Sequence, residues 1–336
     1  MTGIAERTLA GSITSVVEIT PLTRRIGAEV SGVDLSSSID DAQLREIRAA
    51  LARWRVLFFR GQFLSHAEHA AFATKLGPLV YPHFYDEDNP PARVPDEIRA
   101  AEGFPELFTV DNLRSERQRA SVVARGGTVG SSANSYRGVH VDSSAAVNPP
   151  TYSVLRADVL PPFGGDTTWF DLVAAYEGLG EPIRQFVDTL WVEHRFGSEF
   201  DDFLDEERKN AEHRTAHHPL VRVIPETGER ALLLNPVLPA RVLDVSPDES
   251  TWILDFLYEE VTRPAYSVRF RWEPGDLAVS DNRTTAHLGP QDLPAGVDRV
   301  LHLAEVEGDV PISVEGRRSE QIAGIPLRRK QPRSAS

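Results

Sequence analysis

Two residues of the kind that bind metal ions, His140 and Asp142, stand two positions apart in the 336-residue chain. Side chains alternate between the two faces of a β-strand, so in an extended segment both would point to the same side. A third such residue, His287, follows far along the chain, at the end of the segment Asp-Asn-Arg-Thr-Thr-Ala-His. We therefore expect a metal site that one strand and one distant histidine build together.

Two histidines and one carboxylate can occupy one face of an octahedron and leave three positions for other ligands. This arrangement is typical of non-haem Fe(II) oxygenases. A structural zinc site is closed by four protein ligands and leaves no such position. The sequence contains no cysteine, which excludes thiolate metal sites, disulfides and cysteine nucleophiles. His140, Asp142 and His287 are therefore our candidate iron ligands and catalytic centre.

The composition is that of an ordinary globular protein, with 41% hydrophobic and 26% charged residues. A formal net charge of −14 disfavours nucleic acid and anionic membranes as partners, because both reward a basic surface. Because the sequence shows neither an apolar leader nor a run of roughly 20 apolar residues, we expect a cytoplasmic protein.

Hydrophobic periodicity and turn residues predict many strands with a few helices beside them. This pattern favours a sandwich or barrel over alternating strand and helix units. Helices are predicted at 40–54, 65–76, 171–179, 181–190 and 247–262, and strands at 27–33, 56–59, 107–110, 152–159, 167–170, 220–224, 231–234, 267–272, 277–280 and 299–306.

We expect a single domain over residues 1–315, followed by a basic tail over 316–336 that is partly flexible. Two irregular stretches, at about 78–105 and 112–135, flank the approach to His140. Long irregular segments inside a compact domain are usually functional or disordered, and we interpret these two as lids.

The order of motifs along nearly the whole chain resembles the taurine dioxygenase (TauD/TfdA) family of Fe(II)/2-oxoglutarate-dependent dioxygenases, which also contains aryloxyalkanoate dioxygenases and alkylsulfatases. The resemblance implies a double-stranded β-helix, a jelly roll with helices outside, which agrees with the predicted strands. Its motifs are Val56-Leu57-Phe58-Phe59-Arg60-Gly61-Gln62, His140-Val141-Asp142, Asn148-Pro149-Pro150, Gly164-Gly165-Asp166-Thr167, His218-Pro219-Leu220-Val221-Arg222, Phe270-Arg271-Trp272 with Pro274-Gly275-Asp276, Asp281-Asn282-Arg283 with His287, and Arg299-Val300-Leu301-His302.

The resemblance implies that His140, Asp142 and His287 bind Fe(II), and that 2-oxoglutarate and O2 are cosubstrates. It implies that Arg299 pairs with the distal carboxylate of 2-oxoglutarate, which suits the rigid donor fork of a guanidinium. Thr167 would add a hydroxyl donor to the same carboxylate. The expected reaction oxidises a small molecule, by default through hydroxylation, and releases succinate and CO2. A homo-oligomer is left open.

The last strand departs from the family pattern, in which a second arginine four residues after the first holds the substrate sulfonate. Leu303 stands at this position, so we expect a substrate other than taurine. Val139 and Ser280 replace tryptophans of the family pattern, which indicates a reshaped pocket. Arg125 and Arg137 are candidates for another anchor, and Tyr81 and His83 lie where the family places substrate contacts.

Other readings remain open at this point. A jelly-roll sensor or binding protein could keep the metal site without turnover, and a metal-dependent hydrolase is a third possibility. His213 and His217 could share a helix face as zinc ligands, but no glutamate of the His-Glu-x-x-His kind lies between them, so a solvated helix end is the better interpretation.

Overall fold

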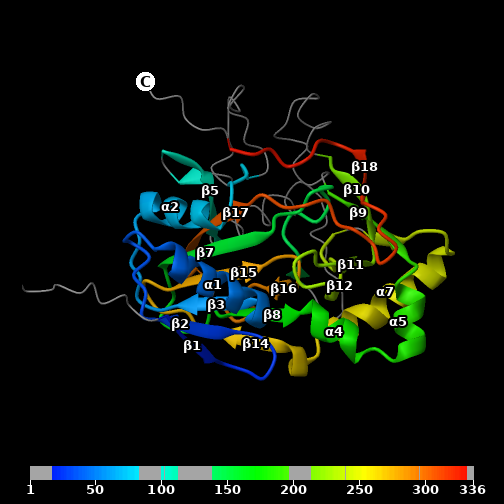
Figure 1. The fold of residues 1–336 in the computed structure, drawn as a ribbon, viewed down its shortest axis with the longest axis horizontal. Coiled ribbons are helices and arrows are strands. Elements are labelled where there is room, and N and C mark those ends of the chain that lie inside the picture. The colour runs from blue at the N-terminus through cyan, green and yellow to red at the C-terminus, as the bar shows by residue number, and fades with distance from the viewer. Residues whose placement is uncertain are drawn as a thin grey trace, which may run out of the picture.

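The computed structural model describes residues 17–82, 100–101, 103–112, 138–196, 213–238, 240–294 and 296–330. As the hydrophobic periodicity predicted, the chain is mainly β with few helices (Figure 1). No helix among the described residues is both long and apolar enough to cross a membrane. The expected lids at 78–105 and 112–135 lie largely outside the described ranges.

An eight-stranded sheet forms the largest layer, in the order β1-β2-β3-β15-β7-β17-β5-β4. The pairs are antiparallel except β2 with β3, which run parallel. The strands are β1 (Glu18–Pro21), β2 (Ala28–Ser31), β3 (Val56–Phe59), β4 (Ala100–Ala101), β5 (Phe104–Asp111), β7 (Tyr152–Val159), β15 (Leu277–Asp281) and β17 (Val300–Val306).

A four-stranded sheet in the order β14-β8-β16-β6 packs against one face of the large sheet. Phe58 of the large sheet stacks on Phe270 of the small one, with ring centroids 3.9 Å apart, and meets Trp169 edge to face. The core between the sheets therefore holds the two layers at a fixed spacing. The strands are β6 (Val139–His140), β8 (Thr167–Asp171), β14 (Ser267–Phe270) and β16 (Thr285–Leu288).

Helices α1 (Asp41–Trp54) and α2 (His66–Leu76) cover the other face of the large sheet (Figure 1). Each begins with a capping box, formed by Asp40 with Gln43 and by Ser65 with Glu68. The reciprocal bonds satisfy backbone donors that a helix start leaves free, which explains why the sequence placed both starts correctly.

A second apolar cluster lies beside the two sheets, where α4 (Leu172–Gly178), α5 (Glu181–Val187) and α7 (Pro247–Val261) gather on the right of Figure 1. A short 3-10 turn, Pro264–Tyr266, follows α7. The remaining strands form a sheet in the order β13-β9-β10-β18 and the hairpin β11-β12. They are β9 (Trp191–Arg195), β10 (Thr215–Pro219), β11 (Val221–Val223), β12 (Arg230–Leu232), β13 (Ala240–Val242) and β18 (Glu320–Ala323).

The interpretation of His213 and His217 as part of a helix end is wrong. His217 lies in strand β10, opposite Glu193 of β9, and its Nε2 is 3.1 Å from a Glu193 carboxylate oxygen. Arg241 also binds Glu193, and these contacts lower the pKa of the carboxyl group to about 2. Cross-strand pairing thus decides the structure here, which local sequence could not reveal.

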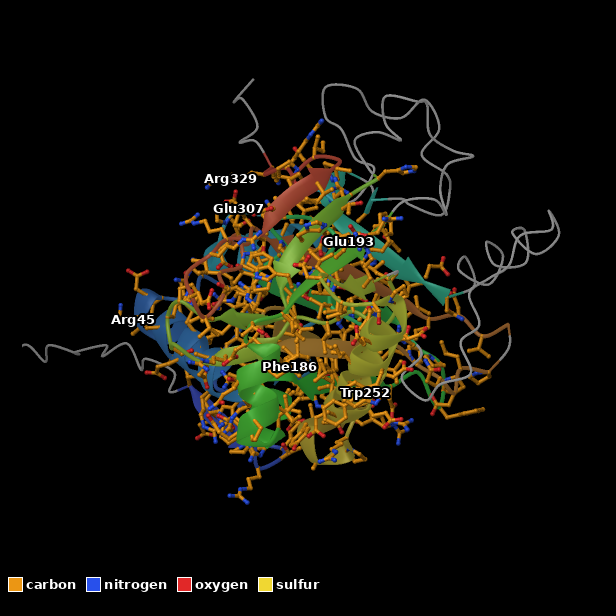
Figure 2. All side chains as sticks on the ribbon, turned by 90° about the vertical axis from the view of Figure 1, so that its right-hand side faces the viewer. Arg45, Phe186, Glu193, Trp252, Glu307 and Arg329 are labelled. Atoms are coloured by element: carbon orange, nitrogen blue, oxygen red, sulfur yellow. The ribbon has the colours of Figure 1, made fainter. Side chains whose placement is uncertain are left out.

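The described part of the basic tail predicted at 316–336 contacts the body of the protein, and its expected partial flexibility stays a prediction. Strand β18 pairs with β10, and Leu327 is buried against Val80 and Ala146. Arg329 lies 3.7 Å from Glu307, and both are labelled at the top of Figure 2. Two cations of the tail, Arg329 and Lys330, thus pair with acidic groups of the body, Glu307 and Glu106. Residues 331–336 lie outside the described ranges.

His69 of α2 gives the fold a testable dependence on pH. Its side chain is fully buried and donates from Nε2 to the Val154 carbonyl at 3.0 Å, and burial lowers its pKa from 6.5 to about 3. Below pH 6.5 the unfolded chain takes up a proton that the folded chain refuses, so stability falls as the pH falls from 6.5 towards 3. We expect the H69Q variant to lose about 1.4 kcal/mol per pH unit of this dependence. Urea unfolding of metal-free protein at several pH values measures the free energy of unfolding. If this free energy depends on pH equally in H69Q and wild type, His69 is not the source of the dependence.

Candidate metal centre and cosubstrate site

The two histidines of the triad meet because strands β6 and β16 pair. His140 and His287 stand directly opposite each other in this antiparallel ladder, and their ring centroids are 4.1 Å apart. Directly opposed residues share a face of the sheet. The pairing therefore turns two histidines that are far apart in sequence into neighbours.

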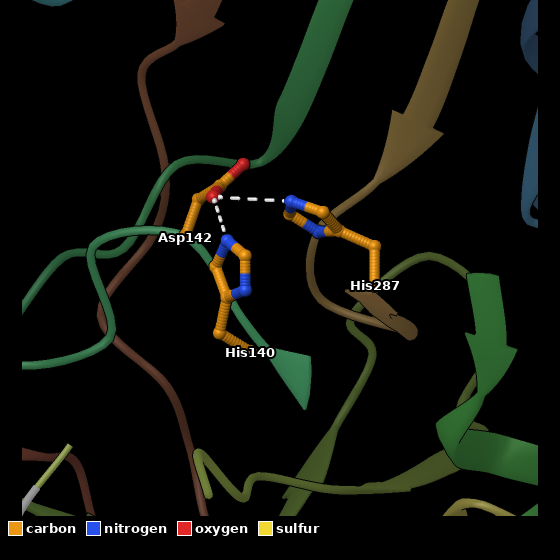
Figure 3. A group of neighbouring side chains, drawn as sticks. All are labelled: His140, Asp142 and His287. Atoms are coloured by element: carbon orange, nitrogen blue, oxygen red, sulfur yellow. Dashed lines mark ion pairs between the residues drawn. The ribbon is translucent and has the colours of Figure 1, made fainter. Parts of the chain in front are cut away.

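Asp142 completes the group just beyond the end of β6. Its Oδ1 lies 3.5 Å from Nε2 of His140 and 3.6 Å from Nε2 of His287 (Figure 3). One ligand atom from each of the three residues lies within 4.8 Å of the others, a spacing that can hold a metal ion. The three side chains are 13 to 35% exposed, so the centre is reachable from outside.

The hydrogen bond of His140 and the burial of His287 both suit metal binding. The Gly138 carbonyl accepts a hydrogen bond from Nδ1 of His140 at 2.8 Å, which leaves Nε2 with its lone pair directed to the site. Gly138 has a φ of +84°, a conformation that other residues rarely adopt. Burial lowers the pKa of His287 to about 4, so its imidazole is neutral at pH 7. The donor set, two imidazoles and one carboxylate, therefore fits Fe(II).

Two residues that sequence reasoning missed hold Asp142 in place. Ser153 of β7 donates to Oδ2 of Asp142 at 2.8 Å, which leaves Oδ1 directed at the histidines. Asn282 accepts from the Asp142 backbone NH and donates to its carbonyl, at 2.9 and 3.1 Å. The Asp-Asn-Arg motif before His287 was a signal for Asn282, whereas Ser153 becomes visible only through sheet register.

Removal of the Ser153 hydroxyl tests this support. We expect S153A to bind Fe(II) or Mn(II) roughly 10 to 100-fold more weakly, because partners that orient ligands typically contribute that much. Titration of metal-free protein with Mn(II) measures the affinity. Thr109, whose hydroxyl contacts His302 on the large sheet, provides the matched control T109V. Equal metal affinity in S153A and wild type would contradict the role.

Arg299 lies at the edge of the same interior, 4% exposed. Its Nε donates to the Gly165 carbonyl at 3.0 Å, and a terminal nitrogen donates to the Thr167 hydroxyl at 3.2 Å. Among the described residues no carboxylate lies within ion-pair distance of it, and burial lowers its pKa to about 10. A buried cation without a protein anion is costly, so this position favours an anionic ligand.

The Thr167 hydroxyl has a donor left for such a ligand. It accepts hydrogen bonds from Arg299 and from Nε1 of Trp272, the latter at 3.0 Å. A hydroxyl that accepts two bonds can still donate its own proton. Thr167 and Trp169 lie two positions apart on β8, and Trp169 is opposite His287. The donor thus lies about 7 Å along the strand from the metal ligands, a span that a short dicarboxylate can bridge.

Comparison with known proteins agrees with this geometry. A sequence model described as "Taurine catabolism dioxygenase TauD, TfdA family" matches residues 18–304. The chain belongs to this family. Membership and the triad together make it an Fe(II)- and 2-oxoglutarate-dependent dioxygenase.

Other members of the family match almost the full length of the chain. An alpha-ketoglutarate-dependent sulfate ester dioxygenase of Pseudomonas putida is 33% identical, over 90% of this chain and 93% of its own. An alkylsulfatase of Acinetobacter baylyi is 32% identical, over 90% and 89%. The crystal structure of a taurine dioxygenase from Burkholderia xenovorans is 39% identical, with a TM-score of 0.75 over 92% of this chain and 96% of that one.

The structure describes two of the residues that the sequence predicts to contact the substrate. Leu303 is half-buried in β17, and Tyr81 is buried where its backbone NH donates to the carbonyl of Arg328 in the C-terminal segment. His83, Arg125 and Arg137 lie outside the described residues. Their assignment as substrate contacts stays a prediction.

Proposed function

We propose that His140, Asp142 and His287 hold the Fe(II) ion of this dioxygenase, and that Arg299 and Thr167 bind the distal carboxylate of 2-oxoglutarate. The observation that carries the proposal is the buried Arg299 guanidinium, which lacks a carboxylate partner among the described residues and lies beside Thr167, near the triad. The two-sheet core is proposed to be a double-stranded β-helix, with the site between its layers.

Each of these residues has a task that follows from its contacts. His140, His287 and Asp142 would supply one face of the coordination shell, with Asp142 oriented by Ser153 and Asn282. When bound, the iron activates O2 for oxidation of the substrate while 2-oxoglutarate is converted to succinate and CO2. Arg299 and Thr167 would fix the cosubstrate through charge-assisted hydrogen bonds. Hydroxylation is the default outcome.

The substrate is proposed to be a small molecule other than taurine. Two relatives are named for sulfate esters and for 2,4-dichlorophenoxyacetate, both anions, and the family pattern holds such groups with a second arginine. Leu303 replaces that arginine here. Loss of a charge-assisted pair costs about 1.5–3 kcal/mol, which is enough to change substrate preference.

Succinate release from Fe(II)-loaded protein tests the proposal. We expect slow release that requires 2-oxoglutarate and O2, and faster release when a substrate is present. Protein loaded with Zn(II) provides the inactive control. Metal binding without succinate release, across a broad panel of small molecules, would favour a sensor or binding protein instead.

A further inference from the structure

Three half-buried apolar side chains form one row across three neighbouring strands. Leu303 of β17 stands opposite Phe108 of β5 on one side and opposite Leu155 of β7 on the other. Directly opposed residues lie on the same face of a sheet. We define Phe108, Leu303 and Leu155 as the apolar row.

The row faces the space between the two sheets. Leu155 packs against the core cluster that both sheets share, and Leu301, two positions before Leu303, belongs to that cluster. Two positions before Leu155 on the same strand, Ser153 donates to the metal ligand Asp142. The row therefore lies two positions along β7 from Ser153, which contacts the triad. It is on the face of the large sheet from which Arg299 reaches Thr167 of the small sheet.

The next residue on this face of β17 toward the triad is an acid, Glu305, and not a cation. Glu305 stands opposite Ser153, is 7% exposed, and accepts a hydrogen bond from Ser143 at 3.3 Å. Whether protonated or charged, this group cannot pair with an anion as a guanidinium does. The nearby Arg214 side chain is held by its own contact, in which Nε donates to the Ile325 carbonyl at 2.8 Å.

We infer that the apolar row binds an uncharged, apolar part of the substrate. In the family pattern this place binds an acid group. The inference rests on the proposed function, because the row gains this role only if the triad holds iron. A sulfonate or sulfate here would lose its hydration and meet Leu303, Leu155 and Phe108 without a compensating cation among the described residues of the row. An alkyl or ring carbon would be buried there favourably.

Two isosteric ligands separate the charge of a substrate from its shape. Hexane-1-sulfonate is an anion, and hexyl methyl sulfone is its uncharged counterpart. Each is titrated without O2 into protein that holds Fe(II) and 2-oxoglutarate, and the shift of the visible iron–2-oxoglutarate absorption band reports binding. We expect the wild type to bind the sulfone at least ~10-fold more tightly, and L303R to reverse the preference by gaining at least ~10-fold in sulfonate affinity.

The control is I322R on strand β18. It also replaces a branched aliphatic side chain with arginine, but at an exposed position. It should keep the wild-type preference. The inference is overturned if the wild type binds an anion, hexane-1-sulfonate or the related hexyl sulfate, as tightly as the sulfone or more tightly. It is also overturned if the wild type binds none of these ligands, or if L303R keeps the wild-type preference. If L303R does not fold, L155Q must weaken sulfone binding by ~5-fold or more for the inference to stand. Absence of the absorption band in the wild type would instead contradict the proposed function.

Discussion

Replacement of Asp142 by alanine is expected to abolish 2-oxoglutarate turnover. Asp142 is the one carboxylate of the triad, and its Oδ1 lies within 3.6 Å of both histidine Nε2 atoms. Without it, two neutral imidazoles must hold a divalent cation, and the charge that balances the ion is lost. H140A and H287A should have the same effect. Metal content after dialysis and succinate release together measure the loss.

The matched control is H217A, which removes a histidine that binds Glu193 on another sheet. It should keep both metal and turnover. D142A also removes the half-buried acceptor of the Ser153 hydrogen bond, so the fold of each variant is checked by circular dichroism. Iron-dependent turnover in a folded D142A protein would rule out the assignment of the metal centre.

Replacement of Arg299 by glutamine is expected to raise the KM for 2-oxoglutarate by roughly 10 to 100-fold, because a charged hydrogen-bonded pair contributes about 1.5–3 kcal/mol. The stability of the metal-free protein should not fall much, since the wild-type guanidinium is buried without a carboxylate partner among the described residues. R299K should fall in between, because an ammonium ion keeps the charge but not the planar fork.

Arg222 provides the comparison, because it is equally buried but pairs with Asp309 at 2.9 Å. R222Q should lose stability and leave the KM for 2-oxoglutarate unchanged. The opposite pattern, in which R299Q destabilises the fold and keeps the wild-type KM, would show that Arg299 has a structural role.

The sequence was a good guide where local signals and motif order decide the structure. Hydrophobic periodicity placed α1, α2 and α7, whose starts the structure caps with capping boxes, and it placed β7 and β15 almost to the residue. Helix and strand positions depend on neighbours in sequence, which is why pattern reasoning reaches them. The triad was named instead from the order of motifs along the chain, before any contact was visible.

The parts that were missed depend on pairing between distant segments. The strand expected to carry both His140 and Asp142 is only the two residues of β6, which pair with β16, and Asp142 lies just beyond its end. Ser153 supports Asp142 only because β7, a strand of the large sheet, passes beside the end of β6. Strand β18 is short and contains an acid, and its place follows from β10 and from the burial of Leu327 nearby. No local window contains this information.

The two-residue strand β6 lies at the edge of its sheet, and two residue pairs join it to β16. An ion bound by His140 on β6 and His287 on β16 would act as a cross-link between the two strands, in addition to their backbone bonds. Part of the metal-binding free energy would therefore order this edge. Loss of the ion would then loosen the strand that carries its own ligand, so that occupancy of the centre and order of the site rise and fall together.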